Sequence, residues 1–211
     1  MMKISIITKA SFFLMTAFFL SCVQKPEEYA VIDTEEGQIV LKFFPDVAPK
    51  HVESFKILAR DGYFNGTSFH RIVPGFVIQG GDPNSKDGDR YNDGLGGRAG
   101  KYYGIGEKDN PDTWMLPAEF NDRPHRRGTL SMARGSHENS AGSQFFICVG
   151  DQFQLDNKYT VFGEVIEGLD TVDRIVETLT PRKRNPNYER PDGYNPVFGM
   201  FMDITLSLIH I

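Results

Sequence analysis

The chain has 211 residues, of which 40% are hydrophobic and 24% charged, the composition of an ordinary globular protein with one domain plus extensions. Its formal net charge of −5 argues against a general nucleic-acid binder, and the basic clusters at 123–127 and 182–184 are interpreted as solvated loops. The 21 Gly and 12 Pro indicate many turns, which favours a β-rich or mixed fold over a helical bundle.

The first residues have the pattern of a targeting segment. Lys3 and Lys9 accompany an uncharged apolar run over 10–20, about half the length that spans a bilayer. Residues 1–21 are therefore predicted to be a secretory signal peptide, with a transmembrane anchor as the alternative. Leu20-Ser21-Cys22 resembles a bacterial lipobox, although Phe19 stands where the usual leucine would be.

The lipobox resemblance implies that Cys22 is the lipid attachment point and the mature N-terminus. Several acyl chains on one residue give a stable membrane anchor. Residues 22–28 are polar and contain Pro26, so they are predicted to be a short tether. The expected location is the bacterial cell envelope, with the protein facing the periplasm or the surface.

Short strands and turns dominate the start of the mature chain. Tyr29–Thr34 and 38–44 are predicted to pair as a hairpin, and 51–60 to form a helix from its 3.6-residue apolar spacing. His51, near the start of that helix, is interpreted as a surface residue. Residues 68–73 and 76–80 are predicted to form a second hairpin, because Pro74-Gly75 suits the centre of a type II turn.

The remaining chain adds strands, one helix and two long irregular segments. Strands are predicted over 129–133, 143–149, 159–165 and 202–211, and an amphipathic helix over 169–179. The segments 82–117 and 181–196 have no period and are interpreted as functional or decorated loops. Seven or eight short strands with two helices favour a mainly β fold, a closed eight-stranded antiparallel β-barrel capped by two α-helices.

Two sequence blocks carry a specific resemblance. Residues 69–82 (FHRIVPGFVIQGGD) and 142–147 (GSQFFI) are similar to the two signature blocks of the cyclophilins, and 44–49, 62–67 and 159–163 agree with them. The resemblance covers residues 29–211 except the two long segments, and implies a cyclophilin-like domain there. It further implies peptidyl-prolyl cis-trans isomerase activity on proline-containing polypeptides, with no cofactor.

The physics of that activity points to Arg71. Amide resonance opposes rotation about an X-Pro bond with a barrier of about 18–20 kcal/mol, and nothing has to be hydrolysed. A catalyst must hold proline in an apolar pocket and stabilise the twisted amide, whose nitrogen regains a lone pair. A guanidinium suits this task, because it keeps its proton and offers five N–H groups in a fixed fork.

The resemblance gives each site residue a role. Arg71 falls on the family's catalytic arginine and Gln79 on the glutamine that orients it. The expected substrate-binding residues are His70, Phe76, Val77, Ala133, Arg134, Gln144, Phe146, Leu155 and Tyr159. Taken alone, Arg71 would be interpreted as a surface side chain and Phe146 as part of the core.

Some residues depart from the family pattern or stay outside the site. Gln154 stands where many cyclophilins have Trp or Phe, which leaves cyclosporin binding open, and Arg134 stands where many have Asn. His70, Asp82 and Glu119 are residue types found in metal and acid–base sites, but no ligand spacing or nucleophile accompanies them, so no such site is predicted.

The last predictions concern Cys148, the oligomeric state and the alternative functions. Cys148 is expected to be buried in its strand and unpaired with Cys22, and the protein to be a monomer. Besides an isomerase that helps exported proteins fold, the chain could be a proline-peptide binding or chaperone module with incidental activity, or a scaffold that leaves the catalytic face unused. The presence of Arg71, Gln79 and Phe146 together favours catalysis.

Overall fold

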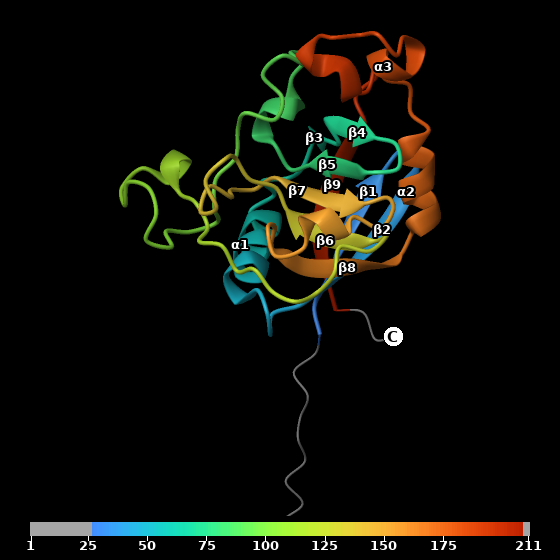
Figure 1. Ribbon diagram of the computed structural model, residues 1–211. Helices are drawn as coiled ribbons and strands as arrows, with labels where there is room; N and C mark the ends of the chain where they lie inside the picture. The colour runs from blue at the N-terminus through green and yellow to red at the C-terminus, as the bar shows by residue number, and fades with distance from the viewer. Residues whose placement is uncertain (1–26, 209–211) are drawn as a thin grey trace, which may run out of the picture.

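A single antiparallel sheet of nine strands carries the fold of the computed structural model, which describes residues 27–208. The predicted signal peptide, Cys22 and most of the tether lie outside the described residues. The strands are β1 (Tyr29–Thr34), β2 (Gly37–Phe43), β3 (Thr67–Ser68), β4 (Arg71–Val73), β5 (Val77–Gly80), β6 (Thr129–Met132), β7 (Phe145–Cys148), β8 (Val161–Glu167) and β9 (Phe201–Ser207). Their order in the sheet is β3-β9-β1-β2-β8-β6-β7-β5-β4 (Figure 1).

The sheet curls on itself, because its two edge strands are consecutive in the chain. Only Phe69 and His70 separate β3 from β4, a link that spans roughly 10 Å at most. The prediction of a mainly β fold with few helices is confirmed, but the sheet has nine strands where eight were expected. The segment 68–73, expected as one strand, pairs with β9 in its first part and with β5 in its second.

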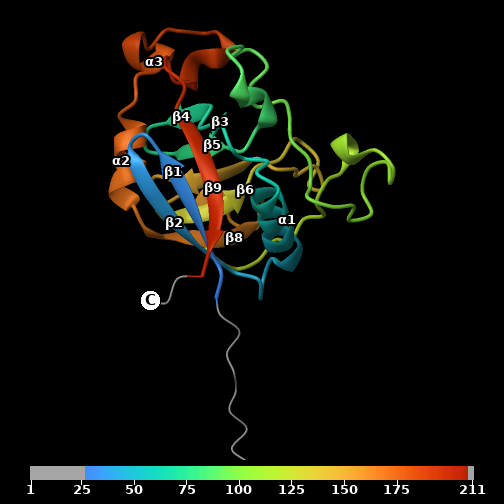
Figure 2. The ribbon, with the colours of Figure 1, turned by 180° about the vertical axis from the view of Figure 1, so that it is seen from behind.

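Two helices lie on opposite sides of the curled sheet (Figures 1 and 2). They are α1 (Pro49–Arg60) and α2 (Leu169–Val176); a single-turn helix, α3 (Pro181–Arg184), and the short 3-10 helices η1 (Pro83–Lys86), η2 (Pro111–Thr113), η3 (Phe153–Leu155) and η4 (Pro191–Tyr194) complete the elements. None of the helices in the described part of the chain has both the length and the apolar character needed to cross a bilayer.

The start of α1 shows that the surface interpretation of His51 is wrong. Ala48 occupies the N-cap position and has no side chain that can bond the first amides. Glu119 replaces that cap, since its carboxylate accepts from the backbone N–H groups of Lys50 and His51. The buried ring of His51 also bonds Glu119, with 2.7 Å between Nδ1 and Oε2, which ties α1 to a segment 68 residues away.

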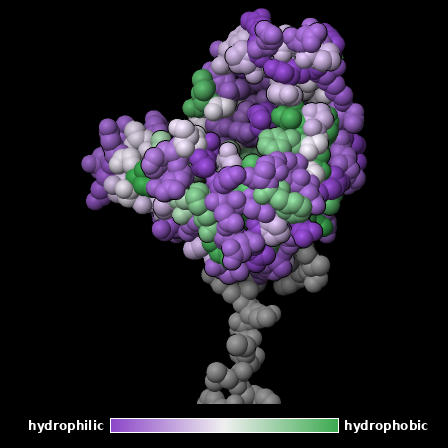
Figure 3. Space-filling model, viewed as in Figure 1, coloured by the Kyte–Doolittle hydropathy of each residue, from purple (hydrophilic) through white to green (hydrophobic). Residues whose placement is uncertain are grey.

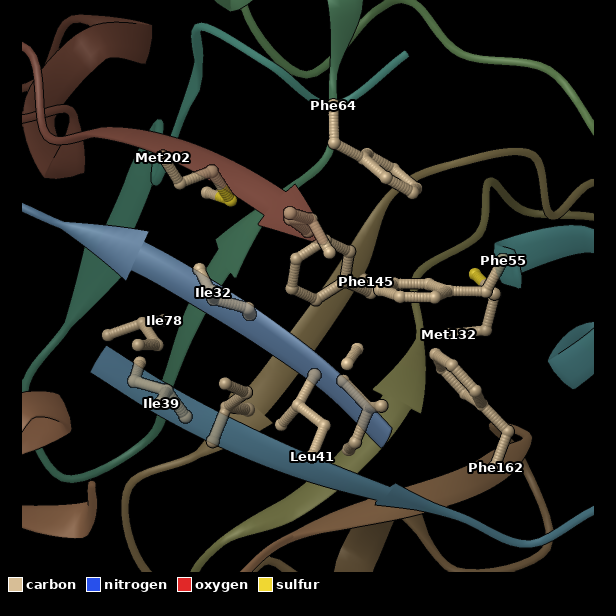
Figure 4. Packing of buried hydrophobic residues seen from close by; sticks show 14 of the residues in the cluster. Ile32, Ile39, Leu41, Phe55, Phe64, Ile78, Met132, Phe145, Phe162 and Met202 are labelled. Atoms are coloured by element: carbon tan, nitrogen blue, oxygen red, sulfur yellow. The ribbon is translucent and has the colours of Figure 1, made fainter. Parts of the chain in front are cut away.

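Aliphatic and phenylalanine side chains fill the space inside the curled sheet (Figure 4). Phe55 of α1 lies at the centre of this cluster, with ring centroids 5.4 Å from Phe145 of β7 and 4.9 Å from Phe64. Ile72 and Ile78 of β4 and β5 point into the same core. Alternate residues of a strand face opposite sides of the sheet. The sequence neighbours of Ile72, Ile78 and Phe145 therefore lie on the outer face of the sheet.

The two long segments contribute no strand to the sheet. The part of 82–117 that contains η2 stands away from the body in both views (Figures 1 and 2). The segment 181–196, with α3 and η4, lies at the end of the molecule where β4 is found, beside the first part of 82–117.

Candidate active site

A tight hairpin places the candidate catalytic residues side by side. In β4 and β5, Arg71 is the register partner of Gln79, and the turn between the strands closes through a bond from the Phe76 N–H to the Val73 carbonyl. Gly75 has a φ of +71°, which a type II turn requires at that position. The expectation of a second hairpin around Pro-Gly is therefore confirmed.

One row of register partners runs across four strands on the outer face of the sheet. Arg71 pairs with Gln79, Gln79 with Phe146, and Phe146 with Ser131 of β6. Because residues in one row share a face, the charged donor, its amide neighbour and an aromatic ring lie next to one another on the outer side. The row explains how residues from separate sequence blocks form one site.

A chain of amide hydrogen bonds holds the guanidinium of Arg71. Its Nη1 lies 3.4 Å from Gln79 Oε1, and Gln79 Nε2 donates to Gln144 Oε1 at 2.9 Å. The Arg71 guanidinium also lies over the ring of Phe76, with 5.6 Å from Cζ to the ring centroid. Burial lowers the pKa of Arg71, while the nearby Tyr194 opposes this shift, and a guanidinium remains charged at any working pH.

A small apolar hollow opens beside Arg71. It is lined by Arg71, Phe76, Val77, Gln79, Ala133, Arg134, Phe146, Leu155 and Tyr159. Its volume is about 100 Å³, well below the several hundred of a typical ligand pocket, so it suits one small side chain. Figure 3 shows hydrophobic side chains gathered in the middle of this face, under a hydrophilic surface formed by the segment with α3 and η4.

Buried groups beneath the hollow support Phe146. The ring of His125 is stacked on it, and Tyr159 meets it edge-on with 5.7 Å between centroids. His125 itself is fully buried, with Nδ1 2.8 Å from Asp156 Oδ1 and Nε2 2.9 Å from Ser131 Oγ. Phe146 is thus held on two sides, as the wall of a selective pocket must be.

The rim of the hollow is polar on the side of Arg134. This guanidinium lies over the Tyr159 ring, 4.8 Å from its centroid, and donates to the carbonyl of Lys158. Gln154 is exposed and bonds Gln152, and Phe153 is half exposed and turned toward Arg126. Neither Gln154 nor Phe153 lines the hollow, so no aromatic ring from η3 covers this rim.

The structure gathers nine of the eleven predicted catalytic and substrate-binding residues around the hollow. The other two are Gln144 and His70. Gln144 lies behind Gln79 and supports it. His70 is buried beside Gly94, and burial lowers the pKa of its ring although the charge of Asp82 opposes this.

Several supporting residues could not be found from the sequence. His125, Ser131 and Asp156 come from three separate segments and carry no spacing signal. In the basic cluster next to His125, Arg127 is exposed and forms an ion pair with Asp173, whereas the half-buried Arg123 lies over the ring of Phe44. In residues 27–208, no group of three or more His, Cys, Asp or Glu is placed to hold a metal ion.

A wider hollow of about 510 Å³ lies between α2 and the turn after β1. Its lining is mostly charged, and Arg174 there pairs with Asp170 and bonds the Glu36 carbonyl. None of its lining residues is aromatic, whereas Phe76, Phe146 and Tyr159 line the hollow beside Arg71. The hollow beside Arg71 is therefore the better candidate for the active site, although it is smaller.

Comparison with known proteins places this site in a family. The family described as "Cyclophilin type peptidyl-prolyl cis-trans isomerase/CLD" matches residues 29–191. A probable peptidyl-prolyl cis-trans isomerase of Brucella abortus is 43% identical over 150 residues, which cover 71% of this chain and 72% of that protein. A peptidyl-prolyl cis-trans isomerase of Synechococcus elongatus is 39% identical over 155 residues, covering 70% and 92%.

A solved structure agrees with the sequence matches. The cyclophilin-type isomerase of Cryptosporidium parvum, solved in the presence of the dipeptide Ala-Pro, is similar with a TM-score of 0.68 and 27% identity, covering 87% of this chain and 99% of that one. The match of the family over most of the chain and the identity to the bacterial relatives are decisive. The chain belongs to the cyclophilin-type peptidyl-prolyl cis-trans isomerases.

Proposed function

We propose that Arg71 carries the isomerase reaction by donating a hydrogen bond to the nitrogen of the twisted prolyl amide. In the planar amide that nitrogen shares its lone pair with the carbonyl and is a poor acceptor. In the twisted state the lone pair returns, so a fixed N–H donor binds that state more strongly than either planar isomer. The observation that carries the proposal is the position of Arg71 at the edge of the small apolar hollow, opposite Gln79.

Catalysis also requires a pocket that holds the proline ring, and the hollow supplies it. Phe76, Phe146 and Leu155 form apolar walls around a volume of about 100 Å³. A ring held there has its amide next to the guanidinium, and burial around Arg71 strengthens the donor because less water competes for it. The Cryptosporidium relative solved with Ala-Pro supports proline-containing peptides as the ligands.

Assays with the purified full-length chain test the mechanism. Cis-trans exchange of a proline tetrapeptide, followed by NMR, should be fast for the wild type and slower by roughly a hundredfold or more for Arg71→Ala. Arg71→Lys should also lose most of the rate, because an ammonium is a compact charge without the planar fork. Arg60→Ala removes an exposed arginine of α1 and should leave the rate unchanged.

The outcomes separate catalysis from binding. Exchange that Arg71→Ala leaves as fast as in the wild type would refute the mechanism. A wild type that binds the tetrapeptide without accelerating exchange would favour the alternative, a proline-peptide binding or chaperone module.

The proposed substrates are exported proteins, and the proposed location is the cell envelope with Cys22 as the lipid anchor. The order of apolar run, small residue and cysteine in 10–22 supports this. In cells grown with radiolabelled fatty acid, the wild-type protein should incorporate the label and the Cys22→Ser variant should not. Equal labelling of the two, or none in the wild type, would remove the anchor from the proposal.

A further inference from the structure

The two long segments of the chain bind each other next to the active site. Residues 90–93, in the loop after β5, meet residues 190–195, around η4. Three side-chain contacts join them: Asn195 Nδ2 donates to Asp93 Oδ2, Arg90 Nη2 lies 3.7 Å from Asp192 Oδ2, and the Arg190 guanidinium lies 4.8 Å from the centroid of the Tyr91 ring. Figures 1 and 2 show the first part of 82–117 and the segment with α3 and η4 at the same end of the molecule, next to β4.

The part of the contact formed by Asp192 and Asn195 is buried, which distinguishes it from a chance approach of two loops. Asn195 is 6% exposed and Asp192 is 3% exposed. A buried amide or carboxylate that lost its partner would cost free energy, so these groups favour one docked arrangement. Tyr188 adds to it, since its hydroxyl donates to Asp192 Oδ1 at 3.0 Å.

The loop that contains Asp93 also holds Gln144, the side chain that supports Gln79. Asp93 is followed directly by Gly94, and the carbonyls of Gly94 and Gly96 accept from Gln144 Nε2 at 2.9 and 2.7 Å. The N–H groups of the same two glycines donate to the buried carboxylate of Asp82. The loop is therefore fixed at Asp93 on one side and at Asp82 on the other.

Hydrogen bonds continue from this loop to the guanidinium. Gln144 turns its oxygen toward Gln79 because its nitrogen is bound to the loop carbonyls, and Gln79 in turn presents its oxygen to Arg71. A carboxamide has a donor end and an acceptor end, so fixing one end fixes the orientation of the next group. A continuous path of contacts thus leads from Asn195 to Arg71.

We propose that the segment Pro181–Pro196 is a positioning element of the active site and that Asn195 is its positioning residue. By holding Asp93, Asn195 keeps the carbonyls of Gly94 and Gly96 where they orient Gln144, and through Gln79 it orients Arg71. The inference rests on the proposed role of Arg71 as the donor to the prolyl nitrogen. Asn195 touches no substrate and acts only through this path.

The first test replaces Asn195→Ala in the full-length chain, with Asn187→Ala as the matched control in an exposed part of the same segment. Asn195→Ala should lower kcat/KM for the proline tetrapeptide by roughly tenfold, or about 1.4 kcal/mol. The loss should fall on kcat, because the apolar hollow that binds the ring is unchanged. Asn187→Ala should keep the wild-type values. Equal kcat/KM for both variants would overturn the inference.

A double-mutant cycle separates positioning from general destabilisation. If Asn195 acts through Gln144, then Asn195→Ala should cause no further loss of kcat in a Gln144→Ala background. A loss of the same size in both backgrounds would mean that Asn195 acts by another route, and would overturn the inference. Thermal unfolding of each variant shows that the compared proteins are folded.

A second variant pair keeps the test independent of any loss of folding. Asn195→Asp alone places two carboxylates against each other and should lower kcat, whereas Asn195→Asp combined with Asp93→Asn exchanges donor and acceptor and should restore it. Failure of the exchange to restore kcat would count against the path. Arg71→Ala in the same assay tests the mechanism itself, so a normal loss in Arg71→Ala with no effect at Asn195 refutes only the inference.

Discussion

The imidazole ring of His125 lies nearly parallel to the phenyl ring of Phe146, with 6.0 Å between centroids and 17° between planes. One face of the aromatic wall of the hollow is therefore set by a buried histidine, itself held by Asp156 and Ser131. Because protein interiors are packed without spare volume, a change beneath Phe146 must reach the hollow above it.

Replacing His125→Ala should weaken both folding and substrate binding. The Ser131 hydroxyl keeps its bond to the Thr160 carbonyl but loses its bond to the His125 ring, which costs about 0.5–1.5 kcal/mol of unfolding free energy. Phe146 also loses the ring that fixes it, so KM for the tetrapeptide should rise more than kcat falls. The exposed His137→Ala is the control. Denaturant unfolding and steady-state kinetics measure both effects, and an unchanged KM in His125→Ala would contradict this role.

The pKa of His125 makes stability sensitive to mild acid. Burial lowers this pKa, although the bonded and nearby carboxylate of Asp156 opposes the shift. As pH falls through the ordinary histidine value of about 6.5, the unfolded chain binds the proton before the folded protein does, so folding stability decreases. His125→Gln should show a shallower loss of unfolding free energy over this pH range, and His137→Gln the wild-type slope. Identical slopes for all three proteins would contradict the assignment.

The site was largely predictable from the sequence wherever its signals are local. The alternation in β4 and β5 and the Pro-Gly turn between them suffice to place Arg71 opposite Gln79. The strand 145–148 follows from its apolar run, and the resemblance to the cyclophilins assigned Phe146. These features depend on neighbours a few residues apart, which a single sequence displays.

The parts that could not be predicted depend on contacts between distant segments. His125 reaches Asp156 across 31 residues and Asn195 reaches Asp93 across 102, in loops without any period. His51 looked like a surface residue because its partner, Glu119, lies 68 residues away. The ninth strand was missed for the same reason, since the pairing of β3 with β9 depends on how the sheet curls.

Glu119 should stabilise the protein at neutral pH and lose that effect in acid. Burial raises its pKa, but the hydrogen bonds from the His51 ring and from the backbone N–H groups of His51 and Lys50 outweigh burial and lower it. A carboxyl whose folded pKa is lowered stabilises the fold above the ordinary glutamate value of about 4.3, and the effect disappears as pH falls through the folded pKa.

Glu119→Ala should therefore cost about 1–3 kcal/mol of unfolding free energy at pH 7, because the first turn of α1 loses its acceptor. The difference from the wild type should shrink below about pH 4.3. Denaturant unfolding over a pH series measures it, with the exposed Glu35→Ala as control. A difference that stays constant down to the acid end of the series would contradict the capping role.

Cys148 should be unreactive in the folded protein. Its side chain is fully buried in β7, and burial, together with the charges of Asp156 and Asp151, raises the pKa of its thiol to about 12. The thiolate is the reactive form, so it is scarce at neutral pH. Peptide mapping after maleimide treatment should find the Cys148 peptide unmodified in native protein and modified in denaturant. Rapid native modification would show that β7 opens locally.

Gln154 should set the affinity of the rim for large ligands. It is exposed and bonds Gln152, so the side of the hollow next to Leu155 lacks the aromatic ring that many cyclophilins have there. Gln154→Trp should strengthen cyclosporin inhibition by roughly tenfold, close to the 0.5–1.5 kcal/mol of one aromatic contact. Exchange of the short tetrapeptide should change little, because the walls that we propose hold the proline ring stay the same. Phe153→Ala, one residue away and turned toward Arg126, is the matched control and should leave inhibition unchanged. Equal inhibition of the wild type and Gln154→Trp would show that the rim does not limit binding.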